Sequence, residues 1–427
     1  MPEKPKNPYR ILLVNFHSTM NAGDLALLIT TRDFLLKIFP QSEIWVSANW
    51  PNEAAYSEYG FKVLPSPWSL SGLNSEIPAS KQIINFLRTI RKLRNTNANF
   101  DYGDLEIDQL RKAYREADLV ISVPGNQFYS SGKYGWPFPV SISGAMLAHR
   151  YKKPLIILPQ SLGPLKRWWE RFLIKRAFGK AKIVFLRDEA SLKLAKDIGL
   201  PKEIINYSPD LALELIPEEE HKAVEVLKNA GFDFDKSSVG LTLISKMNRS
   251  FDSLEMQNYY NVVQESLVQF SQNHDLQVVF FNQVCGPTSV ENDGIVTEKM
   301  AKELIGHGVN VIHINTQLSP QMLKACYGQM DVFIATRLHS GIFALGMAVP
   351  TVLIGYLTKT KGVAKSLNLE EDFIDIPNLT QEKLLEKLET IWKARDAKQV
   401  QIKEILRKAS WDIEKAADKL KEDFGHE

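Results

Sequence analysis

Residues Val278-Val-Phe-Phe281 form an uninterrupted apolar run, and Leu119-Val-Ile121 and Ile156-Ile-Leu158 repeat the pattern elsewhere in the chain. Continuous apolar runs of this length are typical of strands covered on both faces, as in parallel sheets. Helix-length segments with apolar residues three and four positions apart lie between most of them. The alternation predicts βαβ units with right-handed crossovers. Strands are expected at 10–16, 43–48, 118–123, 154–159, 183–186, 238–244, 276–281, 309–313, 331–335 and 350–355.

This number of strands is large for one parallel sheet, so we predict an α/β protein with two Rossmann-like doubly wound domains facing a cleft. The first domain is placed at 1–207, with an insertion at about 65–105, and the second at 208–385. Residues 386–427 should form a helical segment that packs on the core. Its apolar stripe comprises Ile402, Ile405, Leu406, Ala409, Ile413, Ala416 and Leu420.

The composition is that of an ordinary globular protein of 427 residues, with 52 basic and 50 acidic side chains. A net charge of +2 provides no global field for nucleic acid, and no nucleic-acid partner is expected. Cys285 and Cys326 form neither a disulfide framework nor a zinc motif, which favours the reducing cytoplasm. The first residues lack the apolar region of a signal peptide, and no apolar run is long enough to span a bilayer. We therefore expect neither a cleaved signal nor a transmembrane segment.

In doubly wound sheets, ligands bind beyond the carboxyl ends of the strands. The first strand is followed by Asn21-Ala-Gly23-Asp24, in which Asn and Gly permit a tight turn and Asp24 is a candidate helix cap. This loop either presents backbone N–H groups to an anion or is an ordinary βα turn. Neither a dinucleotide-binding fingerprint nor a P-loop motif is present.

Later strands of the first half also end in polar loops. Asn126 follows the strand at 118–123, and Gln160, Ser161 and Gly163 follow the next strand. His149 lies on the helix between them. Arg187 follows the strand at 183–186, where a guanidinium can hold a carboxylate or a phosphate. The alternative for Arg187 is a surface arrangement with Asp188.

The most informative loop, Thr336-Arg-Leu-His-Ser-Gly341, follows the strand at 331–335. If the chain is extended there, Arg337 and His339 share a direction. A fixed cation, a titratable imidazole and a positive helix end then converge, which suits an anionic substrate that needs proton transfer. Tyr356 and Lys361 follow the next strand and extend the same loop region. No metal-binding motif is found among the histidines, so a metal-independent site is expected.

These motifs, in this order, resemble the polysaccharide pyruvyl transferase family. The matching pieces are Asn21-Ala-Gly-Asp24, Gln160-Ser-Leu-Gly-Pro164, Arg187-Asp188 with Ser191, Ser208-Pro-Asp210, Arg337-Leu-His339, and Tyr356 with the lysines after it. The resemblance implies a GT-B-like fold and transfer of a pyruvyl group from phosphoenolpyruvate to a sugar of a cell-surface glycan or its precursor. The implied transfer needs no cofactor, and phosphoenolpyruvate serves as the donor substrate.

Applied to this chain, the resemblance makes His339 and Arg337 the catalytic candidates. The candidate donor-binding residues are Arg187, Arg337, Leu338, Ser340, Gly341 and Lys361. Two alternatives stay open. A nucleotide-sugar glycosyltransferase of GT-B type would share the fold, and so would an inactive carbohydrate-binding or scaffold protein.

Two basic amphipathic segments indicate where in the cell the protein could work. Residues 81–94 combine lysines and arginines with an apolar face, and residues 166–176 combine Trp168 and Trp169 with five cations. Helices of this kind can lie in anionic headgroups, which favours a cytoplasmic enzyme with peripheral contact to the inner face of a membrane and a lipid-linked acceptor. The alternative, the commoner role of amphipathic helices, is packing on their own sheet.

Overall fold

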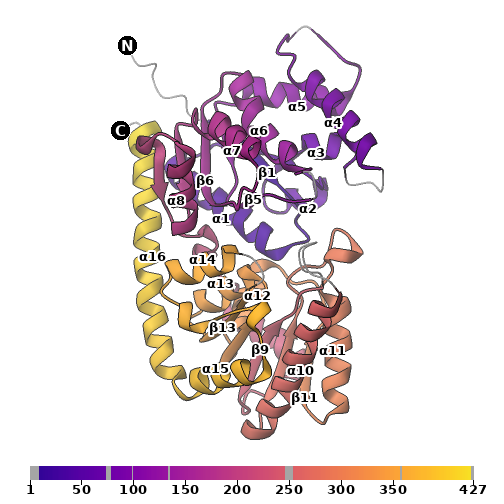
Figure 1. Cartoon of the computed structure of the whole chain (residues 1–427), viewed down its shortest axis with the longest axis vertical. Coiled ribbons are helices and arrows are strands. Elements are labelled where there is room, and N and C mark those ends of the chain that lie inside the picture. The colour runs from indigo at the N-terminus through magenta and orange to yellow at the C-terminus, as the bar shows by residue number, and fades with distance from the viewer. Residues whose placement is uncertain are drawn as a thin grey trace. The chain divides into compact units, whose positions relative to one another are not determined.

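The computed structural model describes residues 9–73, 78–98, 100–132, 135–245, 253–355 and 358–424. The contacts divide the chain into two compact units (Figure 1). The first unit comprises Met1–Thr19, Leu27–Leu211 and Asp412–Glu427. The second comprises Met20–Ala26 and Ala212–Trp411. The short segment Met20–Ala26 thus groups with the second unit, although it lies within the first sequence range.

The first unit is built on a parallel sheet with strand order β3-β2-β1-β4-β6-β7-β8, and β5 pairs with β6. The strands are β1 (Arg10–Phe16), β2 (Glu43–Ala48), β3 (Lys62–Pro65), β4 (Leu119–Ser122), β5 (Gly125–Phe128), β6 (Leu155–Leu162), β7 (Ile183–Leu186) and β8 (Ile205–Tyr207). The helices are α1 (Ala22–Ile38), α2 (Glu53–Ser57), α3 (Pro67–Leu70), α4 (Ala79–Leu93), α5 (Leu105–Glu116), α6 (Phe138–Arg150), α7 (Trp168–Phe178) and α8 (Glu189–Ile198).

Strand β1 shows why its central residues Ile11–Val14 are all apolar. Leu12 and Val14 belong to the core on one face of the sheet. Ile11 and Leu13 belong to the core on the other face. Since successive side chains of a strand point to opposite faces, a strand covered on both sides needs apolar residues at every position.

The second unit repeats the architecture with strand order β11-β10-β9-β12-β13-β14, again parallel throughout. If β9 is taken as the first strand, the strand order is 3-2-1-4-5-6, which is the order of the Rossmann fold. The strands are β9 (Ser238–Thr242), β10 (Gln277–Phe281), β11 (Asn310–Ile314), β12 (Val332–Ala335), β13 (Thr351–Gly355) and β14 (Phe373–Asp375). The helices are α9 (Glu220–Asn229), α10 (Ser253–His274), α11 (Gly294–Gly306), α12 (Pro320–Tyr327), α13 (Leu338–Gly346), α14 (Thr358–Ser366), α15 (Gln381–Lys393) and α16 (Arg395–Phe424). The predicted class, with two Rossmann-like doubly wound sheets, is confirmed.

Short 3₁₀ turns complete the chain: η1 (Lys202–Ile204), η2 (Leu211–Glu214), η3 (Ser289–Glu291), η4 (Glu370–Asp372) and η5 (Ile376–Asn378). Four strands were missing from the prediction: β3, β5, β8 and β14. Each has only three or four residues, and three of them are edge strands. Residues 125–128 were expected to be a turn, but they pair with β6 as β5. So short a strand leaves no periodic signal in a sequence.

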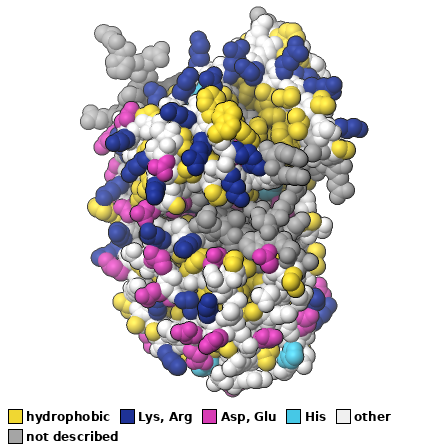
Figure 2. Space-filling model, in the orientation of Figure 1, with side chains coloured by type: hydrophobic (Ala, Val, Ile, Leu, Met, Phe, Trp, Pro, Cys, Tyr) yellow, Lys and Arg dark blue, Asp and Glu magenta, His cyan; other side chains and the backbone are white. Residues whose placement is uncertain are grey.

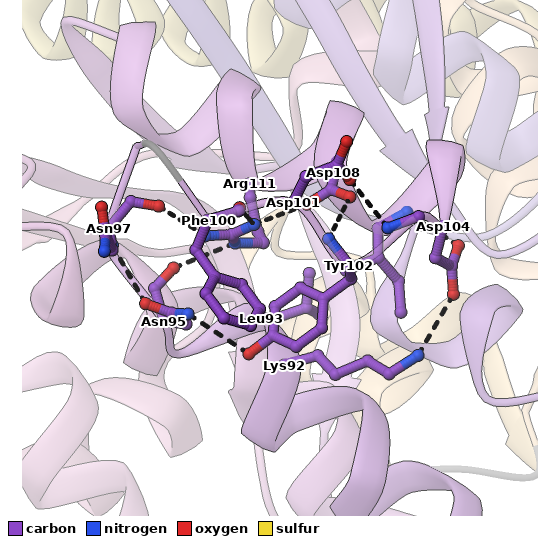
Figure 3. A network of polar contacts seen from close by, with 12 residues as sticks. Lys92, Leu93, Asn95, Asn97, Phe100, Asp101, Tyr102, Asp104, Asp108 and Arg111 are labelled. Carbon is purple, nitrogen blue, oxygen red and sulfur yellow. Dashed lines mark hydrogen bonds and ion pairs between the residues drawn. The ribbon is translucent and has the colours of Figure 1, made fainter.

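The insertion between β3 and β4 is organised by one buried arginine (Figure 3). Arg111 on α5 is 1% exposed and donates hydrogen bonds to the carbonyls of Asn95, Asn97 and Phe100 at 2.7–3.0 Å. It also forms an ion pair with Asp108 at 2.5 Å. The carbonyls of the loop after α4 therefore find their hydrogen-bond partners in one guanidinium.

The C-terminal helix α16 buries most of the predicted stripe, while Ile405 and Leu406 are only partly buried. Ile402, Ala409, Ile413, Ala416 and Leu420 are all at most 5% exposed. Ile413, Ala416 and Leu420 lie in the same core as Ile11 and Leu13 of β1. Within the described part of the chain, no helix is both long and apolar enough to cross a bilayer.

Candidate active site

The candidate site of the second unit begins where β12 meets α13. Arg337 is the extended residue immediately before the helix, with φ −88° and ψ 130°, and His339 lies in its first turn. We expected an extended chain that gives the two side chains a common direction. That expectation is wrong, because the helix already begins at Leu338. The Ser340 hydroxyl donates to the Arg337 carbonyl at 2.7 Å and so closes the first turn.

Arg337 is held by a buried carboxylate. Its Nε and Nη2 donate to the two oxygens of Asp293 at 2.9 and 2.5 Å. The Asp293 side chain is fully buried and also accepts the backbone N–H of Ser245 at 3.0 Å. A bidentate pair with a partner fixed in this way orients the guanidinium. Asp293 was not predicted, because nothing local to residue 293 links it to residue 337.

The loop that precedes α1 joins the same unit. Asn21 forms an antiparallel bridge with Val284, and the Ala22 N–H donates to the Gln283 carbonyl at 3.1 Å. Gly23 then lies directly against His339: a Cβ built on Gly23 would fall 2.3 Å from His339 Nδ1 and 2.6 Å from its Cγ. Only a residue without a side chain permits this approach. The structure therefore brings Gly23 and His339, far apart in sequence, into direct contact.

Helix α1 is capped by Asn21 and not by Asp24. The Asn21 Oδ1 accepts the backbone N–H groups of Gly23 at 3.0 Å and Asp24 at 3.4 Å. This is the geometry of an N-cap, in which the side chain of the residue before the helix accepts from its second and third residues. Asp24 instead occupies the first turn, where its charge favours the positive end of the helix.

Other ionisable groups of this region are held neutral by burial. Burial raises the pKa of the Cys285 thiol, and the nearby Asp293 charge adds to the effect. Burial likewise raises the pKa of Tyr259, whose hydroxyl is hydrogen-bonded to Thr336 Oγ1 at 2.7 Å. Neither group supplies an anionic nucleophile near pH 7. An imidazole is the side chain suited to exchange protons in that range.

The family model of the polysaccharide pyruvyl transferases matches residues 21–358, which include all of these residues. The chain belongs to the polysaccharide pyruvyl transferase family. It is also 23% identical over 407 residues to the amylovoran biosynthesis protein AmsJ of Erwinia amylovora, covering 89% of this chain and 91% of that protein. These relationships make the chain a transferase connected with polysaccharide modification.

Solved structures show the same fold at low identity. The MnaA–UDP structure from S. aureus has a TM-score of 0.60 at 12% identity and covers 97% of this chain and 96% of that chain. HepE of Anabaena in complex with UDP-glucose has a TM-score of 0.56 at 13% identity and covers 96% of this chain and 99% of that one. These likenesses confirm the GT-B-like fold that the family resemblance implied.

Several family-motif residues of the second unit are packing residues. Leu338 and Ser340 are buried, and the Ser340 Oγ lies 2.7 Å from Thr242 Oγ1. A Cβ on Gly341 would fall 2.4 Å from Leu353. The side chains of Leu338 and Ser340 therefore support α13, Gly341 allows its close packing, and only the backbone groups of these residues remain candidates for contact with a donor. Lys361 is exposed on α14, and Tyr356 lies outside the described residues.

The predicted donor contact of Arg187 is not supported by its surroundings. The guanidinium is 1% exposed, forms an ion pair with Asp210, and donates from Nε to Ser161 Oγ at 2.8 Å. Ser161 in turn donates to Asp188 at 2.8 Å, and Asp188 caps α8 by accepting from Ser191. The family motifs of the first unit thus form one buried polar network. These contacts give Arg187 a structural role in the first unit, and its contact with the donor stays a prediction.

The remaining predicted loop residues of the first unit are also mainly structural. Gln160 and Ser161 were expected to follow the strand, but both lie within β6, which continues to Leu162. Gln160 is fully buried, and its amide donates to the Val123 carbonyl. His149 Nε2 lies 2.6 Å from the Ala177 carbonyl, which places the ring between α6 and α7. Gly163 has φ 86° and packs against Leu194. Asn126 lies within β5 and is half-buried.

Proposed function

We propose that the chain transfers a pyruvyl group from phosphoenolpyruvate to two hydroxyls of a sugar in a cell-surface polysaccharide or its precursor. The observation that carries the proposal is the cation Arg337, oriented by Asp293, on the same helix start as His339. An anionic donor needs a fixed positive charge, and ketal formation needs proton transfer.

The reaction balances without a cofactor. The methylene carbon of phosphoenolpyruvate gains a proton and becomes a methyl group, while C2 gains oxocarbenium character. One sugar hydroxyl adds to C2 and loses its proton. The second hydroxyl then displaces phosphate from C2, which closes the ketal ring, and its proton leaves with the phosphate. The products are the pyruvyl ketal and inorganic phosphate.

The residues divide these tasks as follows. Asp293 holds the Arg337 guanidinium in a fixed orientation, and this fixed positive charge would attract the donor's carboxylate or phosphate. His339 would exchange a proton with the methylene carbon or with a sugar hydroxyl. Gly23 keeps the imidazole in place and brings the backbone of the α1 start to it. The positive end of α13 adds to the field at the same point.

The direct test is incubation with phosphoenolpyruvate and a panel of glycan precursors, with mass spectrometry for the added pyruvyl group and an assay for released phosphate. We expect His339→Ala to lower turnover by about two or more decades. His307→Ala, an exposed histidine of the same unit, is the matched control and should leave turnover unchanged. Transfer from UDP-glucose in place of phosphoenolpyruvate would instead establish the glycosyltransferase alternative. A folded His339→Ala protein with full activity would remove the imidazole from the mechanism.

We also propose that the enzyme works in the cytoplasm against the inner face of a membrane. On α7, Trp168 is 78% and Phe172 56% exposed, one helical turn apart, and the neighbouring Arg171 and Lys175 are exposed too. On α4, Leu87 is 60% exposed. Figure 2 shows hydrophobic and basic side chains side by side over this part of the first unit. Aromatic residues among cations suit an anionic lipid surface.

A further inference from the structure

A small pocket of about 140 Å³ opens in the first unit, and none of the residues discussed above as site candidates lines it. It lies at the carboxyl ends of β1 and β2, where Asn15 is near the end of β1, His17 follows β1 and Asn49 follows β2. Strand β1 is flanked by β2 and β4, so the strand order reverses at β1. In doubly wound sheets this switch point is where ligands bind. A volume of this size corresponds to roughly ten water molecules, or about one monosaccharide.

The described lining of this pocket mixes apolar and uncharged polar side chains and carries no Lys, Arg, Asp or Glu. Its polar groups are amides, hydroxyls, an imidazole and an indole, from Asn15, His17, Ser47, Asn49, Ser66, Trp68, Tyr114, Gln127, Ser141 and Ser143. A phosphate or carboxylate ligand would require fixed cations or a cluster of N–H donors. The lining therefore suits a neutral ligand that is rich in hydroxyl groups.

Hydrogen bonds hold these side chains in position. Asn15 has φ 70° and donates from Nδ2 to the Ser141 carbonyl at 2.6 Å, which ties the end of β1 to α6. Ser66 Oγ donates to Asn49 Oδ1 at 2.7 Å. The Asn49 Nδ2 lies 3.3 Å from His17 Nδ1, and because an amide nitrogen only donates, the neutral ring carries its proton on Nε2. The polar groups are thus arranged before any ligand arrives.

Two lining side chains still carry buried polar atoms that lack a hydrogen-bond partner among the described residues. One is a donor, Trp68 Nε1, and the other is an acceptor, Gln127 Oε1. A sugar hydroxyl can both donate and accept, so it matches this pair. A side-chain rotation toward a bound hydroxyl would give each atom the partner it lacks.

We propose that this pocket binds one neutral sugar residue of the acceptor glycan, with Trp68 and Gln127 as specificity-determining residues. The assignment to an acceptor rests on the proposed pyruvyl transfer, whereas the assignment to a neutral sugar rests on the pocket alone. The pocket is chemically distinct from the Arg337 and His339 site, which carries the charge that phosphoenolpyruvate requires.

The test measures binding and transfer separately on the full chain. Isotope-labelled tryptophan indoles are observed by NMR while methyl glycosides of glucose, galactose, mannose and N-acetylglucosamine are added at millimolar concentration. Trp68→Phe assigns the Trp68 indole signal. We expect at least one glycoside to shift that signal, and Gln127→Met to raise the dissociation constant about fivefold, the factor for one lost hydrogen bond. Gln109→Met, the same substitution at an exposed position of α5, is the matched control and should not change it.

The outcomes separate the two proposals. A Trp68 signal that no glycoside shifts, or a shift that Gln127→Met and Gln109→Met affect equally, overturns the pocket assignment even if pyruvyl transfer occurs. Saturable binding at Trp68 that Gln127→Met weakens supports the sugar site even if phosphoenolpyruvate is not a donor. Where transfer is observed, Gln127→Met should raise the acceptor KM about fivefold and leave the phosphoenolpyruvate KM unchanged.

Discussion

Gly23 has no side chain, and His339 occupies the space where one would be. Gly23→Ala would place a methyl group 2.3 Å from His339 Nδ1, so the imidazole must move. We expect turnover to fall about a hundredfold, the scale of a small misplacement of a catalytic group. Steady-state kinetics with phosphoenolpyruvate checks this. Gly306→Ala, where a Cβ meets nothing within 4 Å, is the matched control. Unchanged turnover in Gly23→Ala would show that the position of His339 is not critical.

The two arginines of the family motifs should behave differently when they are replaced. Arg337→Lys loses the forked guanidinium that Asp293 orients. We expect the phosphoenolpyruvate KM to rise by one to two decades, roughly the contribution of one charged hydrogen bond.

Arg187→Met leaves Asp210 buried without its partner, so it should lower the free energy of unfolding by about 3–5 kcal/mol. Denaturant titration and donor kinetics on both variants check this. A raised donor KM in Arg187→Met would restore Arg187 to the donor site.

At the scale of single elements, α7 is the helix on which the proposed membrane contact can be tested. Trp168 and Phe172 share one exposed face of this helix. We expect wild-type protein to float with anionic liposomes at low salt, where electrostatic attraction is strongest, and to be released as salt rises. The double variant Trp168→Gln/Phe172→Gln should lose most of this flotation. Trp411→Gln, at a 55% exposed tryptophan of α16, should retain it. Absence of wild-type flotation at low salt would leave α7 as a surface helix.

The elements also show where sequence patterns succeed. Strands such as β1 and β10 were predicted close to their observed bounds, because both faces are covered and each strand contains an unbroken run of four apolar residues. Strand β5 was missed, since its Gly125-Asn-Gln-Phe128 sequence has the composition of a turn. Residues 125–128 form a strand because they pair with the neighbouring strand β6. Their own sequence does not indicate a strand.

At the scale of the whole molecule, Lys324 anchors the chain that enters the second unit. It is 3% exposed and donates to the carbonyls of Leu213 and Leu215 at 2.9 and 2.7 Å. Burial lowers the pKa of Lys324 from 10.5 to about 8. Between pH 8 and 10.5 the unfolded state therefore binds more protons than the folded state, and this group makes stability rise with pH.

Lys324→Met removes that contribution. We expect the free energy of unfolding of the wild type to rise with pH relative to Lys324→Met, with a slope approaching about 1.4 kcal/mol per pH unit within this window. Urea titrations of both proteins between pH 7 and 10.5 measure the difference. Parallel pH profiles for the two proteins would show that the Lys324 pKa is not lowered.

The sequence by itself determined the parallel sheets, the strand-end loops and the residue types of the site, because burial and backbone turns leave local signals. Arg337, His339 and the Asn21–Asp24 loop could all be selected in this way. The sequence could not show which candidates are buried: Arg187 has the same local setting as Arg337, yet its partner Asp210 comes from the strand-end segment after β8.

Only the tertiary structure decided which of these residues meet. Gly23, Asp293 and His339 come from three separate segments. Their contacts depend on the pairing of Met20–Ala26 with the chain after β10 and on the ion pair between Asp293, just before α11, and Arg337, just before α13. The pocket at Asn15, Trp68 and Gln127 likewise assembles from β1, α3 and β5, three elements far apart in the sequence. Sequence periodicity shows which residues of a segment face the core and which face solvent. Contacts between distant segments depend on tertiary packing, which no single segment encodes.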